Sequence, residues 1–118
     1  MKITMIDVTK IVPVLLLSSS MVEARFHTQC SCDSGVNNSL TFDWQLTFNA
    51  CVNNYSGEAS YNPAEGRCHW FKGHHVQGDD WNAVCIQQAI DGYYPVTNGL
   101  VDTTRPKITG RTGHGYCK

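Results

Sequence analysis

The chain has 118 residues, and its nine Lys and Arg nearly balance its ten Asp and Glu, for a formal net charge of -1. This balance argues against a nucleic-acid-binding protein, which usually carries a basic stripe, and against a polybasic membrane anchor. Six cysteines in so short a chain are typical of an exported domain in which up to three disulfides supplement a small hydrophobic core.

The beginning of the chain resembles a cleavable secretion signal. Lys2 and Lys10 provide a basic start, residues 11–17 form a short apolar run, and small residues follow where a signal peptidase would cut. The apolar run is too short to span a bilayer, which needs about 20 residues, so we expect no stable membrane anchor. We expect residues 1–24 to be removed and residues 25–118 to form a single disulfide-rich secreted domain.

The first half of this domain contains one clear strand candidate and one ambiguous segment. Residues 25–33 are expected to form a strand, and Ser34-Gly35 is expected to turn the chain. In residues 40–55 apolar and polar residues alternate, which favours a strand, but a helical stripe is also present over a length unusual for a strand. For a helix, the sequence offers Asp43 in the first turn and three candidate caps, Asn38, Ser39 and Thr41.

The second half offers a clear helix. Asp79 and Asp80 place negative charge at its start and Gly92 stops it. Its apolar face consists of Trp81, Val84, Cys85 and Ala89, widened by Ile86 and Ile90. The expected elements are a strand over 58–72 with a turn at Asn62-Pro63, a short strand or loop over 73–76, the helix over 79–90, a loop over 95–107 and a glycine-rich strand over 107–117.

With a helix over 40–55, the order of elements predicts an α+β fold. Two helices between split strand pairs suggest a ferredoxin-like βαββαβ sandwich, with both helices on one face of an antiparallel sheet. Two cysteines then lie on the first strand, one on each helix and one on each of two later strands: Cys30, Cys32, Cys51, Cys85, Cys68 and Cys117. A Cys30–Cys32 bond would be strained, so we expect these two to bridge to different elements, at least one of them to a helix.

This cysteine distribution resembles that of small secreted fungal effectors related to the virally encoded killer toxin of smut fungi, the killer protein six type. The resemblance is carried by Cys30-Ser31-Cys32, Thr47-Phe48-Asn49-Ala50-Cys51, Cys68, Trp81-Asn82-Ala83-Val84-Cys85 and Cys117. It implies an α/β sandwich with Cys51 on a helix, which favours a helix over 40–55. It also implies export, to a host apoplast or into a host cell, and action on another organism. The family has no shared catalytic site, so no residue role follows from it.

One set of residues suggests catalysis. Glu65, Arg67 and His69 alternate and would share one strand face. A guanyl-type ribonuclease uses such groups, with a carboxylate as base, a guanidinium to stabilise phosphate charge and an imidazole as acid. His27 or His114 would supply a second imidazole. A plain polar strand face above an inward Cys68 and Trp70 explains the same alternation, and we prefer that interpretation.

Other polar motifs have simple structural explanations. Residues 73–80 combine two histidines and two aspartates, but adjacent histidines diverge, and we expect no metal or cofactor. Asn37 and Asn54 each precede a serine by two positions, which makes both candidate glycosylation sites in an exported chain. The surplus aromatic residues are expected mostly in the core, namely Trp70, Phe71, Tyr93, Tyr94 and Tyr116.

Three functions follow as hypotheses. We favour a secreted, non-enzymatic, effector-like protein that binds a host or competitor protein through its surface, as a monomer and without nucleic acid. The first alternative is a secreted ribonuclease that uses Glu65, Arg67 and His69. The second is a killer toxin that acts on competing microbes, against which the near-neutral charge argues.

Overall fold

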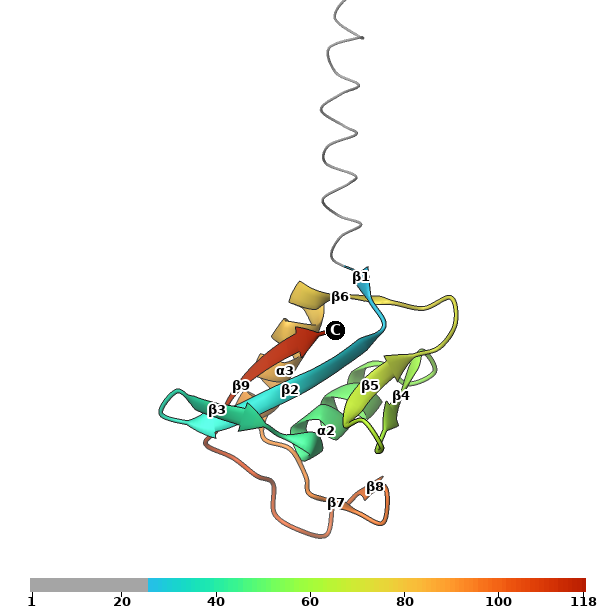
Figure 1. Cartoon of the computed structure of the whole chain (residues 1–118). Helices are drawn as coiled ribbons and strands as arrows, with labels where there is room; N and C mark the ends of the chain where they lie inside the picture. Colours follow the sequence, from blue (N-terminus) through green and yellow to red (C-terminus); the bar gives the residue numbers. More distant parts are fainter. Residues whose placement is uncertain (1–25) are drawn as a thin grey trace, which may run out of the picture.

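The computed structural model describes residues 26–118, so the expected secretion signal lies outside the described residues. In these described residues the fold is mixed α+β, with a main antiparallel sheet and two helices (Figure 1). In chain order the elements are β1 (Phe26–His27), β2 (Gln29–Val36), β3 (Ser39–Phe42), α2 (Trp44–Asn54), β4 (Ala59–Asn62), β5 (Arg67–Trp70), β6 (Val76–Gln77), α3 (Gly78–Asp91), β7 (Val96–Thr97), β8 (Leu100–Val101) and β9 (Thr112–Cys117).

The central strand of the main sheet is β2. On one side β9 pairs with it from Cys30 opposite Cys117 to Gly35 opposite Thr112. The other side of β2 is shared, because β5 pairs with its beginning and β3 with its end. Strand β4 pairs with β5 and completes the order β4-β5-β2-β9, in which all neighbours are antiparallel. Two small pairs, β1 with β6 and β7 with β8, lie outside this sheet.

Both helices pack behind the main sheet and join its strands (Figure 1). Helix α2 leads to β4, and α3 leads through a long loop to β9. Asp43 caps α2, since its carboxylate accepts a hydrogen bond from the backbone N–H of Leu46 at 2.9 Å. Helix α3 has Asp79 and Asp80 in its first turn, as expected. It stops at Gly92, also as expected, because the φ of 86° at this residue is incompatible with a right-handed helix.

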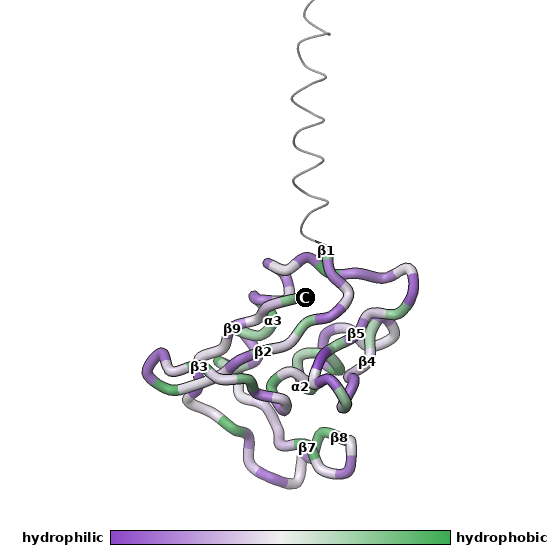
Figure 2. The backbone as a smooth tube through the Cα atoms, viewed as in Figure 1, coloured by the Kyte–Doolittle hydropathy of each residue, from purple (hydrophilic) through white to green (hydrophobic). Residues whose placement is uncertain are grey.

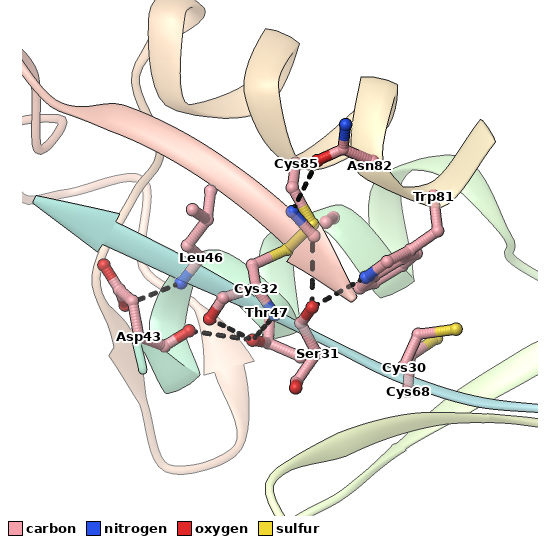
Figure 3. The surroundings of a disulfide bond; sticks show 12 residues. Cys30, Ser31, Cys32, Asp43, Leu46, Thr47, Cys68, Trp81, Asn82 and Cys85 are labelled. Atoms are coloured by element: carbon pink, nitrogen blue, oxygen red, sulfur yellow. Dashed lines mark hydrogen bonds between the residues drawn. A yellow bond between two sulfur atoms is a disulfide. The ribbon is translucent and has the colours of Figure 1, made fainter. Parts of the chain in front are cut away.

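Three disulfides connect the two layers and the centre of the sheet. Cys30 pairs with Cys117 of β9, Cys32 with Cys85 of α3, and Cys51 of α2 with Cys68 of β5. The expectation that Cys30 and Cys32 bridge to different elements, one of them a helix, is confirmed. Figure 3 shows the Cys32–Cys85 bond beside Trp81, whose indole N–H donates to the Ser31 carbonyl at 2.8 Å.

The core lies between the sheet and the helices and is small. Three aromatic rings fill its middle, with Trp70 packed edge-on to Tyr55 at 4.9 Å and to Trp81 at 5.5 Å between centroids. Leu46, Ala50 and Ala89 are fully buried around them, together with the sulfurs. Such a core gains from covalent bonds between its layers.

Several sequence expectations need correction. The helix does not cover 40–55: Ser39–Phe42 is a strand, α2 begins at Trp44, and Asp43 is the cap rather than a first-turn residue. The short alternation at Leu40 and Phe42 belonged to this strand. The turn is also not at Ser34-Gly35, because β2 continues to Val36 and turns at Asn37-Asn38, whose positive φ values suit a type I′ hairpin.

The remaining differences concern surfaces and loops. The strand expected over 25–33 is interrupted at Thr28, so only its second part joins the main sheet. Ile86 and Ile90 do not widen the buried face of α3, because they are 37% and 65% exposed. The loop expected over 95–107 contains the β7–β8 hairpin, and the last strand begins at Thr112 rather than at 107. The single strand expected over 58–72 is in fact two strands, β4 and β5, which pair with each other on either side of the expected turn at Asn62-Pro63.

Candidate binding groove

Exposed aromatic side chains gather at the end of the domain where β3 passes into α2. Two adjoining hollows, with volumes of about 360 and 380 Å³, share Trp44, Tyr61 and Pro63 as lining residues. We call the pair the aromatic groove. Its other lining residues are Phe48, Val96, Asn98 and Gly99 in the first hollow and Phe42, Ala64, Glu65 and Gly66 in the second.

The corner between β3 and α2 fixes the first wall of the groove. The position of Asp43 is fixed by hydrogen bonds, since its N–H donates to the Cys32 carbonyl at 3.0 Å and its carboxylate caps the helix. The residues on either side of it, Phe42 and Trp44, are 49% and 44% exposed. Large apolar side chains at such exposure on a held backbone are typical of a binding surface rather than a core.

The opposite wall comes from the β4–β5 hairpin. The ring of Tyr61 packs against Phe48 of α2 at 5.2 Å between centroids, and burial raises the pKa of the Tyr61 phenol. Gly66 lies directly under Phe42: a Cβ at this glycine would come within 2.7 Å of the Phe42 ring. The β4–β5 hairpin therefore contacts two aromatic rings of the groove, Phe48 through Tyr61 and Phe42 through Gly66.

The third side is a loop held by side chains of α2. Asn49 is buried, and its amide donates to the Tyr94 carbonyl at 2.9 Å. The Gln45 side-chain oxygen accepts a hydrogen bond from the Val96 N–H at 2.9 Å. Asn98 and Gly99 then form the tip of the β7–β8 hairpin, with φ values of 54° and 76° that a type I′ turn requires. These bonds connect the loop to the helix that carries Trp44 and so fix the position of this side of the groove.

One charged side chain lines the groove, among the residues that the structure describes. Glu65 lies at the end formed by the second hollow, with 42% of its side chain exposed. Its carboxylate oxygen Oε2 is 3.1 Å from Nε2 of His69. No Lys or Arg side chain lines either hollow, so the electrostatic character of the groove is set by this carboxylate.

The suggested catalytic residues are brought together only in part. Glu65 and His69 are in contact, and Arg67 faces the same side of β5, opposite Asn62 of β4. Cys68 and Trp70 are buried on the other side, as expected from the alternation.

The candidates for a second imidazole lie on other strands. His114 is on β9, opposite Asp33, and β2 separates that strand from β5. His27 on β1 contacts the Lys118 carbonyl at 3.2 Å. Neither histidine is placed beside Glu65 by the strand register.

The histidines of the 73–80 segment point to different neighbours. His74 lies 3.8 Å from the Glu58 carboxylate, and the ring of His75 packs against Phe26 at 4.3 Å between centroids. Within residues 26–118 no group of three or more His, Cys, Asp or Glu side chains is arranged to hold a metal ion.

The two glycosylation candidates differ in their surroundings. Asn37 is exposed at the tip of the β2–β3 hairpin. Asn54 ends α2, and its side-chain nitrogen, the atom that would carry a glycan, donates to the Ala50 carbonyl at 3.0 Å. Glycosylation at either site stays a prediction.

The aromatic residues singled out from the sequence divide between core and surface. Trp70 and Tyr93 are buried, Phe71 and Tyr116 are exposed, and Lys107 lies over the half-buried ring of Tyr94. Exposed apolar residues also lie at β8, drawn green in Figure 2, where Leu100 is 72% exposed.

The groove residues were missed because they come from three separate segments, residues 42–48, 61–66 and 96–99. The one local signal was Asp43, a capping residue type placed between two aromatic side chains.

Comparisons with protein families, with curated proteins and with solved structures give no match. In the described part of the chain no helix is both long and apolar enough to cross a bilayer. The evidence on function therefore comes from the aromatic groove and from the polar face of β5 beside Glu65.

Proposed function

We propose that this protein is a secreted, non-enzymatic binding protein of the effector type, which recognises a host or competitor protein through the aromatic groove. The observation that carries the proposal is a pair of exposed aromatic rings, Phe42 and Trp44, beside the half-buried ring of Tyr61, on a backbone fixed by helix capping and hydrogen bonds. Trp and Tyr dominate binding energy at interfaces, and a preformed site reduces the ordering cost of association.

The disulfide framework supports the secreted part of this proposal. Three disulfides in a described region of this size are typical of proteins that work in an oxidising compartment. They also explain how a small core suffices to hold the groove rigid.

We further propose that the domain is a ferredoxin-like βαββαβ sandwich of the killer protein six type. The strand order β4-β5-β2-β9, with α2 and α3 as the crossover helices between strands, supports this topology. Strand β3 and the two small strand pairs are then additions to it. The positions of Cys51 and Cys85 on the two helices support the same relationship.

The proposal is tested by affinity capture from host and competitor extracts with the disulfide-intact domain. Trp44→Ala and Tyr61→Ala remove groove side chains, and Ile90→Ala is the matched control because Ile90 is 65% exposed on α3, outside the groove. We expect a protein retained by wild type and by Ile90→Ala to be lost with both groove variants. Equal retention by all four proteins would overturn the groove as the recognition surface.

A second candidate function, a ribonuclease, is favoured by one contact, that of Glu65 with His69 at 3.1 Å on a strand face that also carries Arg67. In this mechanism Glu65 would accept the 2′-hydroxyl proton and His69 would protonate the leaving oxygen. Incubation of the oxidised protein with RNA decides the question. Cleavage that Glu65→Gln abolishes would establish the second candidate, and no cleavage would reject it.

A further inference from the structure

We propose that the ligand of the aromatic groove is a proline-rich segment of the partner protein, bound as a polyproline II helix with a basic residue beside Glu65. This inference rests on the proposed binding function and names the chemical class of its partner. It follows from the shape of the groove, from the chemistry of its lining and from the position of its one charge.

The shape of the groove suits an extended chain. Its two hollows lie side by side, because Trp44, Tyr61 and Pro63 line both of them, and neither hollow is an enclosed cavity. A polyproline II helix advances about 3.1 Å per residue with three residues per turn, and its backbone needs no partner strand. Successive turns can therefore enter successive hollows, while the shared Trp44 and Tyr61 rings lie between them.

The lining of the groove favours proline over a sugar or an anion. Its walls are the rings of Phe42, Trp44, Phe48 and Tyr61 together with Pro63. Aromatic-lined grooves are the common receptors of polyproline II segments. Among residues 26–118, Asn98 and Glu65 are the only other polar side chains that line it, which is few for a sugar with many hydroxyls, and none of these residues places a basic side chain there for an anion.

The charge of the groove sets the orientation of the ligand. Glu65 lies at the end of the second hollow and is 42% exposed at its side chain, so an arginine or lysine of the ligand can reach its carboxylate from solvent. A proline-rich segment with a basic residue at one end would then bind in a single direction, with its prolines between Trp44 and the β7–β8 hairpin.

The test uses synthetic peptides and the nitrogen-15-labelled domain. The first probe is a capped decapeptide of one arginine followed by nine prolines; the second has glutamate in place of arginine; the third is a glycine–serine decapeptide. Trp44 is the exposed tryptophan, while Trp70 and Trp81 are buried, so its indole N–H signal reports directly on the groove. We expect the arginine peptide to shift this signal, the glutamate peptide to bind about tenfold more weakly, and the glycine–serine peptide to leave it unchanged.

Two variants sharpen the test. Glu65→Arg should reverse the preference between the arginine and glutamate peptides. Trp44→Ala lacks the indole reporter, so its binding is followed by the backbone amide signals of Phe48 and Glu65, and it should bind the first peptide at least about tenfold more weakly. Ile90→Ala should bind like wild type. Retained disulfides and an unchanged amide spectrum outside the groove show that each variant is folded.

The outcomes separate this inference from the proposed function. No shift with any peptide at millimolar concentration, or a preference that Glu65→Arg leaves unchanged, would overturn the proline-rich ligand. If captured partners still depended on Trp44 in that case, the groove would remain a binding site for another ligand. If capture did not depend on Trp44, the binding function itself would fail.

Discussion

At the scale of single residues, Asp43 makes more hydrogen bonds to distant parts of the chain than the sequence pattern predicted. Besides capping α2, its carboxylate accepts hydrogen bonds from the hydroxyls of Ser34 and Tyr93, both of which are buried. Arg111 donates to Ser34 at 2.9 Å and extends the network to the segment before β9. The corner that presents Phe42 and Trp44 is therefore held by a polar cluster inside the domain.

Asp43→Ala should lower the free energy of unfolding by about 2–4 kcal/mol, because it removes a helix cap and leaves the buried Tyr93 hydroxyl without its carboxylate partner. Denaturant unfolding of the oxidised protein measures this. Asp91→Ala, at an exposed carboxylate near the end of α3, is the control and should change stability by less than about 0.5 kcal/mol. Equal effects of the two substitutions would contradict the role given to Asp43.

The same cluster predicts a pH dependence. Burial, followed by the hydrogen bond to Asp43, raises the pKa of Tyr93 to about 12 from its ordinary value of 10.0. The folded state therefore holds the phenol proton more tightly than the unfolded state. The resulting stability is complete below pH 10 and is lost as the pH rises from about 10 to about 12. Burial also raises the pKa of Tyr55 and Tyr61, so the comparison with Tyr93→Phe isolates this residue. The wild type should lose more stability than Tyr93→Phe across this range; parallel curves would contradict the account.

At the scale of elements, the close packing of α3 on β9 depends on two glycines. A Cβ at Gly113 would come within 2.5 Å of the Cys85 carbonyl oxygen, and one at Gly115 within 2.7 Å of the Cys85 sulfur. The helix can thus approach the strand backbone closely enough for the Cys32–Cys85 bond to form beneath it (Figure 3). His114 and Tyr116, which alternate with these glycines, are exposed on the other face.

Gly113→Ala should destabilise the domain by about 1–3 kcal/mol, because the added methyl group must displace helix backbone rather than a flexible side chain. His114→Ala, at the next position of the same strand, should have a smaller effect, since this side chain is exposed. Thermal unfolding of both variants measures the difference. A neutral Gly113→Ala would show that α3 does not lie against β9 as described.

Some elements were predictable from the sequence because their signals are local. The first turn of α3 with Asp79 and Asp80, its stop at Gly92, and the turn after Asn62 all follow from residue preferences that the structure retains. The boundaries within residues 40–55 could not be predicted in this way, because the segment contains the end of a four-residue strand followed by a helix. The alternating pattern of the strand and the helical pattern therefore occur in the same stretch of sequence. The groove was beyond prediction for a different reason, since contacts such as Phe48 with Tyr61 depend on tertiary structure.

At the scale of the whole molecule, the disulfides close loops of very different length. They join residues 87, 53 and 17 positions apart, so that the beginning of the sheet is bonded to its last strand and each helix to the sheet. Longer closed loops remove more entropy from the unfolded chain, with about 2–4 kcal/mol expected for each bond. A rigid groove on a small core is the expected result of such a framework.

Peptide mapping of the non-reduced protein should recover three pairs: Cys30–Cys117, Cys32–Cys85 and Cys51–Cys68. Cys30, Cys68 and Cys117 lie in one cross-strand row, so a Cys30–Cys68 pair is the nearest alternative in the same register. Its recovery as the major species would contradict the described framework.

The central claim is that the aromatic groove binds the partner, and the affinity of a captured partner for three forms of the domain tests it most directly. Isothermal titration should give at least a tenfold weaker dissociation constant for Trp44→Ala than for wild type, with Ile90→Ala unchanged. Trp44 is 44% exposed, so its removal should lower the thermal stability only in part, and thermal unfolding of each form shows that it is folded at the temperature of the titration. Equal affinity of Trp44→Ala and wild type for a partner that both bind fully would contradict the account.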